Sequence, residues 1–240
     1  MLIAGLDFET TGVDPHNDRV IEVGAVLYDW DTRLPIRMIS ELVKTDVPLT
    51  EEITEITGIT ELDLHRFGMA DHEAMGRLCE IIDPASYVMA HFGAEFDKHF
   101  YQSWSERTFW PERLQPWLDT AVDIVYPERI KTRNLRHLAA EHGFLNPFSH
   151  RAVFDVLTML QIASQYDLEA ISKRAAEPII YFEAVVKYEH KDKAKERGYR
   201  WHAPTKKWWK SMKQSDFYRE SEECGFPLLT LSYNPEKAAL

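Results

Sequence analysis

The sequence predicts an α/β fold in which helices flank a sheet, followed by a small α+β module. Three observations support this prediction. Apolar runs typical of buried strands dominate residues 2–43, helical patterns and one further strand follow up to residue 166, and a basic, tryptophan-rich segment lies beyond residue 180. The 240 residues, 45% of them hydrophobic, suffice for one domain with its own core and a second, smaller one.

The elements of the first domain follow from the spacing of apolar residues. Short apolar runs bounded by turn formers predict strands at 2–7, 20–28, 36–43 and 86–91. Helical periodicity predicts helices at about 70–82, 94–105, 119–125, 134–142 and 151–166. Helical character weakens after Asp167, and Glu177-Pro178 is the expected boundary, so we predict domains at 1–176 and 179–240.

Shorter elements are expected in the second domain. We predict a strand at 181–188, a helix at 191–197, a hairpin at 199–210 and a last helix at 215–224. Gly198 is expected to end the first of these helices, because glycine adopts the left-handed conformation found after many helix C-termini. The hairpin is expected to turn at Ala203-Pro204-Thr205.

Composition and length exclude several classes of protein. No apolar run approaches the roughly 18 residues that a membrane-spanning helix needs. Met1 to Asp7 resemble a strand and not a signal peptide. Cys79 and Cys224 form neither a metal-binding pair nor a disulfide framework. These features predict a cytoplasmic protein with free thiols and no membrane partner.

The formal net charge of −11 is unevenly distributed along the chain. Residues 187–213 contain ten basic and three acidic residues, whereas residues 1–179 contain 16 basic and 30 acidic residues. An acidic body with a basic appendage is therefore expected. A basic segment of this kind is typical of nucleic-acid-binding proteins, even where the whole chain is acidic.

Two carboxylates close the first expected strand, in Asp7-Phe8-Glu9. Alternate side chains of a strand share a face, so Asp7 and Glu9 should point the same way and Phe8 into the other layer. Two like charges side by side are costly unless a cation neutralises them or one is protonated. For such a pair alone, a solvated strand end is the commoner explanation. Other residues must show whether the pair belongs to a functional site.

Three further residues supply that context. Asp97 follows the strand at 86–91 and a turn at Gly93, while His150 and Asp155 lie at the start of the helix expected at 151–166. A spacing of five leaves the last two on the same broad side of a helix. Each of them taken alone fits a capping or surface residue.

In this order and spacing, the five residues resemble the DEDDh family of 3′→5′ exonucleases, which has a DnaQ-like, RNase H-like fold. The resemblance covers roughly residues 1–166. Its motifs are Asp7-Phe8-Glu9-Thr10-Thr11-Gly12, Ile21-Glu22-Val23-Gly24-Ala25-Val26, Ile56-Thr57-Gly58-Ile59-Thr60, Trp117-Leu118-Asp119-Thr120 and the segments around Asp97 and His150–Asp155.

Two positions refine the resemblance. The sister subfamily carries Tyr four residues before the last Asp; here that residue is Arg151, and His150 one position earlier selects the histidine branch. The family usually has Asn where this sequence has Phe92. This departure changes local hydrogen bonding, or it adds a stacking surface for a terminal base.

The resemblance implies a metal-dependent hydrolase that releases nucleoside monophosphates from 3′ ends. Asp7 would bridge two divalent ions, Mg²⁺ or Mn²⁺, with Glu9 and Asp155 completing the first site. Asp97 would act on the second ion, largely through water. His150 would be the general base, because histidine titrates near neutral pH. The residues that resemble the family's pocket for the terminal nucleotides are Phe8, Thr10, Thr11, Thr57, Gly58, Ile59 and Phe92.

The basic segment interleaves lysines with three of the seven tryptophans. We expect Lys206, Lys207, Trp208 and Trp209 to bind nucleic acid, because lysines meet phosphates and aromatic faces stack on bases. The alternative is a small domain whose tryptophans form its only core. The segment is also similar to the HARP-type domain of annealing helicases, which implies DNA binding. Docking to a replication or repair protein is a further interpretation.

Three other functions stay open at this point. An exoribonuclease acting on RNA ends or oligonucleotides is the alternative within the enzyme class, and the basic module favours DNA. A non-catalytic nucleic-acid-binding adaptor is less consistent with the sequence, because all five catalytic positions carry the expected residue types. A proofreading subunit is possible, although no polymerase-binding segment is identifiable.

Overall fold

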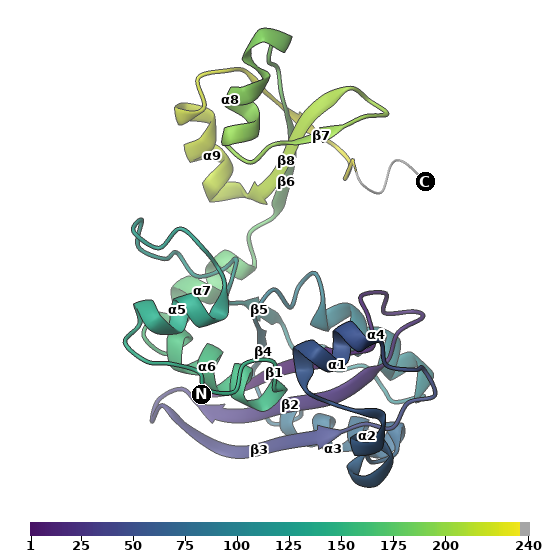
Figure 1. Cartoon of the computed structure of the whole chain (residues 1–240). Helices are drawn as coiled ribbons and strands as arrows, with labels where there is room; N and C mark the ends of the chain where they lie inside the picture. The colour runs from purple at the N-terminus through teal and green to yellow at the C-terminus, as the bar shows by residue number, and fades with distance from the viewer. Residues whose placement is uncertain (236–240) are drawn as a thin grey trace. The chain divides into compact units, whose positions relative to one another are not determined.

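Figure 1 shows the computed structural model, which describes residues 1–235. The chain divides into two compact units, Met1–Ala175 and Ala176–Leu240. Each unit has its own sheet and its own hydrophobic core. No helix within residues 1–235 is long and apolar enough to cross a membrane.

The first unit contains a five-stranded sheet in the order β3-β2-β1-β4-β5. The strands are β1 (Leu2–Thr10), β2 (Val20–Asp29), β3 (Leu34–Leu42), β4 (Tyr87–Ala90) and β5 (Trp117–Asp119). β1, β2 and β3 are antiparallel neighbours, whereas β4 runs parallel to β1 and β5 parallel to β4. The predicted mixed sheet is confirmed, and β1 lies at its centre.

Helices cover both faces of this sheet (Figure 1). The helices are α1 (Glu51–Thr57), α2 (Glu61–Phe67), α3 (Asp71–Ile82), α4 (Asp97–Arg107), α5 (Leu135–Glu141), α6 (Ala152–Ala163) and α7 (Leu168–Ala175). The apolar side chains of α3 and α4 form one core with one face of the sheet. Those of α5, α6 and α7 form a second core with the opposite face.

The alternation of side chains along β1 decides which of these faces carries the carboxylates. Leu6 and Phe8 belong to the core on the α3–α4 side. Ile3 belongs to the other core, and a Cβ atom at Gly5 would lie 2.8 Å from Val156 of α6. Asp7 and Glu9 continue this second set of alternate positions and face the α6 side. The prediction that they share a face opposite Phe8 is confirmed.

Several predicted elements differ from the structure. The helix expected at 119–125 is a single turn, because the Asp119 carboxylate accepts the Ala121 N–H and Asp123 accepts the Asp119 N–H. Side-chain acceptors close this turn locally and compete with a helix. α4 begins at Asp97 and not at 94, since residues 93–96 form a turn. The elements not predicted from the sequence include α1, α2, α7, β5 and a strand at Leu228–Leu231.

The second unit contains a four-stranded sheet in the order β7-β8-β6-β9. Its elements are β6 (Ile179–Ala184), a 3-10 turn η1 (Tyr188–His190), α8 (Lys191–Glu196), β7 (Arg200–His202), β8 (Lys207–Lys213), α9 (Gln214–Glu223) and β9 (Leu228–Leu231). The predicted hairpin, both helices and the left-handed Gly198 are confirmed. The strand expected at 181–188 ends at Ala184.

Candidate active site

Asp7 and Glu9 lie side by side on the α6 face of β1, at the end of the strand where it leaves the sheet. Phe8 packs into the opposite layer, where its ring meets Trp104 edge-on with ring centroids 5.8 Å apart. The Phe8 N–H donates to Asp97 Oδ1 at 3.1 Å. The third carboxylate is therefore bonded directly to the backbone between the first two.

Asp97 reaches this position because Asp119 fixes the loop that precedes it. The Asp119 carboxylate, at the end of β5, accepts the N–H groups of Phe92 and Ala94 at 3.0 and 3.1 Å. Asp119 is 4% exposed, so these bonds are made in the protein interior. The sequence indicated Asp119 only as part of the motif Trp117-Leu118-Asp119-Thr120. Its structural role was not predicted, because β5 was not recognised as a strand.

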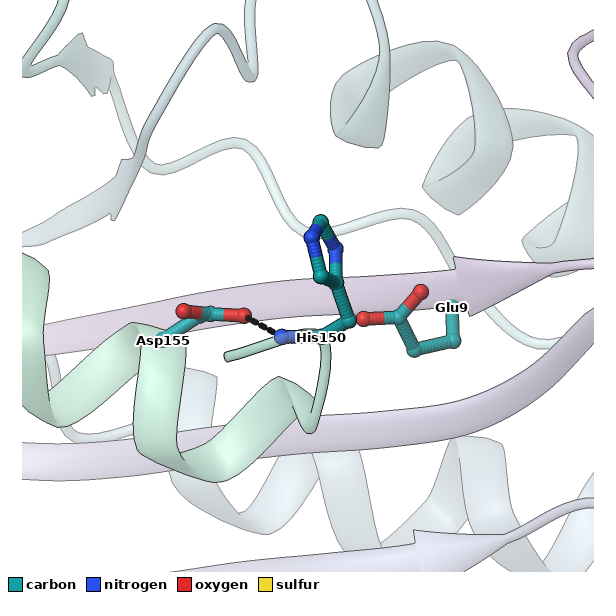
Figure 2. Close-up of side chains that lie close together, drawn as sticks. All are labelled: Glu9, His150 and Asp155. Atoms are coloured by element: carbon teal, nitrogen blue, oxygen red, sulfur yellow. Dashed lines mark hydrogen bonds between the residues drawn. The ribbon is translucent and has the colours of Figure 1, made fainter. Parts of the chain in front are cut away.

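Asp155 lies in the first turn of α6 and organises the segment before the helix. Its Oδ2 atom accepts the His150 backbone N–H at 2.7 Å, and its Oδ1 atom accepts from Asn146 Nδ2 at 2.7 Å. His150 has a φ of +63°, a conformation that histidine tolerates better than most residues. Figure 2 shows the imidazole pointing away from α6, with Glu9 beside it.

A buried glutamate fixes the start of α6 against the sheet. Glu22 on β2 is 1% exposed and accepts the Ala152 N–H at 3.1 Å. Arg151 donates to both of its carboxylate oxygens at 2.9–3.2 Å. A Cβ atom at Gly24 would lie 2.2 Å from Val153 N, so only glycine allows the helix to approach this closely. Glu22 and Gly24 thereby position His150 and Asp155.

Burial and mutual repulsion raise the pKa values of the carboxylates in this cluster. The pKa of Asp7 lies well above its ordinary value because the group is buried and faces Asp97 and Glu9. Burial and the charge of Glu22 raise the pKa of Glu9 to about 8. Burial also raises the pKa of Asp97 to about 7, against the bond from Phe8. The pKa of Asp155 is raised by burial as well.

All five residues named from the sequence line one cleft. Glu9, His150 and Asp155 each offer one possible ligand atom, and these three atoms lie within 4.8 Å of one another. The full lining consists of Asp7, Phe8, Glu9, His91, Phe92, Phe96, Asp97, Asn134, Leu135, Arg136, Ser149, His150 and Asp155. The segment 134–136 and His91 were not predicted as site residues. His91 connects the two sides of this region, since its ring contacts Thr120 Oγ1 and the Arg133 carbonyl oxygen at 2.8 and 2.6 Å.

The predicted nucleotide-pocket residues fall into two groups. Phe8 and Phe92 line the cleft, and Phe92 is 47% exposed. The others do not line it: Thr10, Thr11, Thr57 and Ile59 are buried, and Gly58 is the left-handed residue that ends α1. The Thr10 hydroxyl donates to the Gly12 carbonyl oxygen, which shapes the turn after β1. Contact of these residues with a nucleotide stays a prediction.

The predicted accessory residues of the second unit differ in their exposure and in their contacts. Trp209 is 3% exposed and lies under the guanidinium of Arg200, 4.4 Å from the ring centroid. Lys207 forms an ion pair with Glu183. Lys206 lies in the exposed hairpin turn, and Trp208 is partly buried. The tryptophans thus serve partly as core, which was the alternative interpretation of this segment.

Residues 4–163 match a family model described as "Exonuclease". The match covers more than half of the chain and contains all five predicted catalytic residues. The chain belongs to this exonuclease family. Residues 180–230 match a second model, described as a domain of unknown function, DUF8626. The likeness of this segment to HARP-type domains stays a prediction.

Curated relatives of this exonuclease chain include two bacterial polymerases. DNA polymerase III PolC-type of Thermotoga maritima is 29% identical over 153 residues, and that of Pediococcus pentosaceus is 28% identical over 151 residues. Each alignment covers 62% of this chain and 10% of the relative. The similarity therefore concerns about a tenth of the length of these relatives.

Solved structures with a similar fold include those of E. coli exonuclease I. The zinc-ion-bound ExoI–ssDNA complex has a TM-score of 0.60 at 20% identity and covers 68% of this chain and 39% of that chain. The complex with a dT13 oligonucleotide has a TM-score of 0.61 at 16% identity and covers 76% and 48%. These similarities confirm the RNase H-like sheet predicted from the sequence.

Proposed function

We propose that this chain is a 3′→5′ exonuclease that hydrolyses DNA from its 3′ ends and releases nucleoside monophosphates. The observation that carries the proposal is the convergence of four carboxylates and one histidine on the cleft beside β1, within a segment that belongs to the exonuclease family. The four carboxylates come from β1, α4 and α6, so the tertiary fold brings together like charges that are far apart in the sequence. Functional sites concentrate such perturbed groups.

The donor set fits divalent cations. Asp7, Glu9, Asp97 and Asp155 offer carboxylate oxygens, which are the ligands that Mg²⁺ and Mn²⁺ prefer. Arg151 forms its ion pair with Glu22 and not with any of these four. We propose that the four carboxylates would hold two such ions. The bound ions would supply charge stabilisation and water activation for phosphodiester hydrolysis.

His150 is the proposed general base. Its backbone is fixed by the bond to Asp155, while the imidazole lies exposed beside Glu9 (Figure 2). A base in this position can accept a proton from a water molecule that enters the cleft and pass it to solvent. Phe92, exposed at the cleft rim, is the proposed stacking surface for the terminal base.

DNA is the proposed substrate. The polymerases and the ExoI–ssDNA complex named above support this choice over RNA, as does the basic second unit. An exoribonuclease is the alternative that the experiment below must exclude. Docking of the second unit to a replication or repair protein remains a separate hypothesis.

The proposal is tested by measuring the degradation of end-labelled substrates with Mg²⁺ or Mn²⁺. The substrates are single-stranded DNA, duplex DNA and RNA. We expect shortening from the 3′ end of DNA, no shortening in excess EDTA, and none with Asp7→Ala or Asp155→Ala, which should keep their circular dichroism spectra. His150→Ala should slow hydrolysis by roughly 10²-fold or more. Full activity of Asp7→Ala in EDTA would overturn the proposal, and faster degradation of RNA would overturn the choice of DNA.

A further inference from the structure

The second unit carries a groove that shares no residue with the active-site cleft and only Trp208 with the predicted accessory residues. Its lining comes from η1, α8 and the β7–β8 hairpin: Tyr188, Lys191, Asp192, Lys195, Trp201 and Trp208. Three of these six residues are aromatic and two are lysines. We propose that this groove binds single-stranded DNA, with bases stacked on the aromatic rings and phosphates paired with the lysines.

The aromatic rings are exposed in a way that core packing does not explain. Trp201 is 50% exposed and Tyr188 82% exposed. Trp201 and Trp208 are partners across the β7–β8 pair, so their rings lie on one face of the hairpin, with centroids 5.5 Å apart. Trp208 also packs against the core of the unit, which anchors this pair to a rigid element. Large exposed aromatic surfaces of this kind mark binding sites.

Trp208 and the adjacent Trp209 lie on opposite faces of the hairpin. Neighbouring residues on a strand point to opposite faces, so burial of Trp209 on one face places Trp208 on the other. Trp209 is covered by Arg200, while Trp208 faces the groove with Trp201. Trp209 is therefore buried on the face away from the groove, while Trp208 contacts both the core of the unit and the groove.

Lysines complete the groove from the side of α8. Lys191 and Lys195 are four residues apart and therefore lie on one face of this helix. Lys191 Nζ lies 4.1 Å from the centroid of the Tyr188 ring, and Lys195 is exposed. Asp192 is the single acidic residue of the lining, so the lining carries a net positive charge.

Alternating rings and cations fit an unpaired nucleic-acid strand. Its bases expose their faces for stacking and its phosphates lie close by, whereas the base faces of a duplex are already stacked. The choice of DNA over RNA rests on the proposed function, because nothing in the groove selects a 2′-hydroxyl group. The groove would then hold substrate strands independently of the cleft in which they are cut.

Binding of fluorescein-labelled oligo(dT) to the full chain in EDTA tests the groove separately from hydrolysis. We expect Trp201→Ala to weaken binding about tenfold or more, the effect of removing a stacking partner. The double variant Lys191→Ala/Lys195→Ala should weaken binding and reduce the slope of log Kd against log salt by about 1.4, or 0.7 for each lost contact to a single strand. Duplex DNA should bind more weakly than oligo(dT).

The chain offers matched controls for both changes. Tyr218 on α9 is 57% exposed and lies outside the groove, so Tyr218→Ala removes a comparable ring. Lys193→Ala removes the same charge from α8 but at a position that does not line the groove. Both controls should bind like the unmodified protein.

Two results would overturn the inference. One is an equal Kd for the unmodified protein, Trp201→Ala and the double lysine variant; the other is tighter binding of oligo(rU) than of oligo(dT). Failure of the proposed function gives a different pattern, since the unmodified protein would then bind oligo(dT) in EDTA but not shorten it with Mg²⁺. Thermal unfolding shows whether Trp201→Ala is folded. If that variant is unfolded, the double lysine variant alone tests the groove.

Discussion

Phe92 combines a large side chain with a left-handed backbone, at a φ of +58°. A residue with a Cβ atom is strained there, and asparagine is one of the few that tolerates this conformation. The asparagine usual in the DEDDh family therefore suits the backbone of this turn, as well as any hydrogen bond it makes. The phenylalanine here is retained at a cost in stability, which is consistent with a role in the cleft.

Phe92→Asn should increase the free energy of unfolding by roughly 1 kcal/mol through release of this strain, as measured by urea denaturation. Phe109 is a matched control, with a φ of +53° and a side chain 94% exposed outside the cleft. Phe109→Asn should give a similar gain in stability. If Phe92 stacks on the terminal base, only Phe92→Asn should raise KM; an unchanged KM would contradict this role.

The raised pKa of Glu9 predicts how the metal-free protein responds to pH. Its folded-state pKa of about 8 lies above the ordinary value of 4.5, so the protonated form is favoured by folding. This contribution to stability is complete at low pH and is lost as pH rises through about 8. In EDTA, the melting temperature should therefore fall between pH 6 and pH 9.

Glu9→Gln removes this titration and should flatten the dependence of melting temperature on pH. Divalent ions bind the ionised carboxylates, so Mg²⁺ should raise the melting temperature of the unmodified protein more at pH 8.5 than at pH 6. Differential scanning fluorimetry at several pH values measures both effects. A metal-free melting temperature that rises toward pH 9 would contradict the assignment.

At the level of elements, the contact between α6 and β2 determines whether the two halves of the site meet. Two of the five site residues lie on or just before α6, and Asp7 and Glu9 lie on β1 next to β2. The helix N-terminus is joined to the sheet through Glu22, which accepts backbone and guanidinium hydrogens. A buried anion there also complements the positive end of the helix dipole.

Gly24→Ala should disrupt this contact, because its Cβ atom would overlap the backbone of Val153 at 2.2 Å. Backbone atoms cannot rotate away as a side chain can, so α6 must shift. We expect a loss of stability of about 1–3 kcal/mol, the usual effect of overpacking, and a loss of activity larger than stability explains. Gly143→Ala offers a comparison, since no atom lies within 4 Å of its Cβ position and only its φ of +87° is strained. Comparable activity in both variants would contradict the role of Gly24.

At the level of the whole molecule, each unit has the features of an independent domain. The core of the second unit is built around Phe182, Ala184, Ala194 and Tyr199, all from residues after Ala176. The first unit closes its two cores within Met1–Ala175. Separate cores predict that neither unit needs the other to fold.

A chain truncated after Ala175 should therefore fold and retain hydrolysis of short oligonucleotides, as measured by circular dichroism and by release of nucleoside monophosphates. Its affinity for long single-stranded DNA in EDTA should fall, with a smaller salt dependence, because the lysines of the second unit are lost. An insoluble or unfolded product would show that the units depend on each other. Unchanged affinity would favour a protein-docking role for the second unit.

The sequence predicted β1, β2 and β3 because these strands are long and clearly bounded by turn formers, and it missed β5, which has only three residues. It missed α1, α2 and α7, which have only seven or eight residues each, so their apolar spacing gives little periodic signal. The turn at 119–123 was mistaken for a helix because its carboxylate-to-backbone bonds are not visible in a hydrophobic pattern. In such short segments, tertiary contacts determine whether a helix, a strand or a turn forms.

The sequence alone predicted the chemistry of this protein, because motifs that resemble those of the DEDDh family named Asp7, Glu9, Asp97, His150 and Asp155. It could not determine what holds them in place. The bonds from Asp119 to the loop before Asp97 and from Glu22 to the start of α6 join segments up to 130 residues apart. Only the folded chain brings such groups within bonding distance, and only the exposure of Trp201 beside Trp208 shows where the basic hairpin forms a groove.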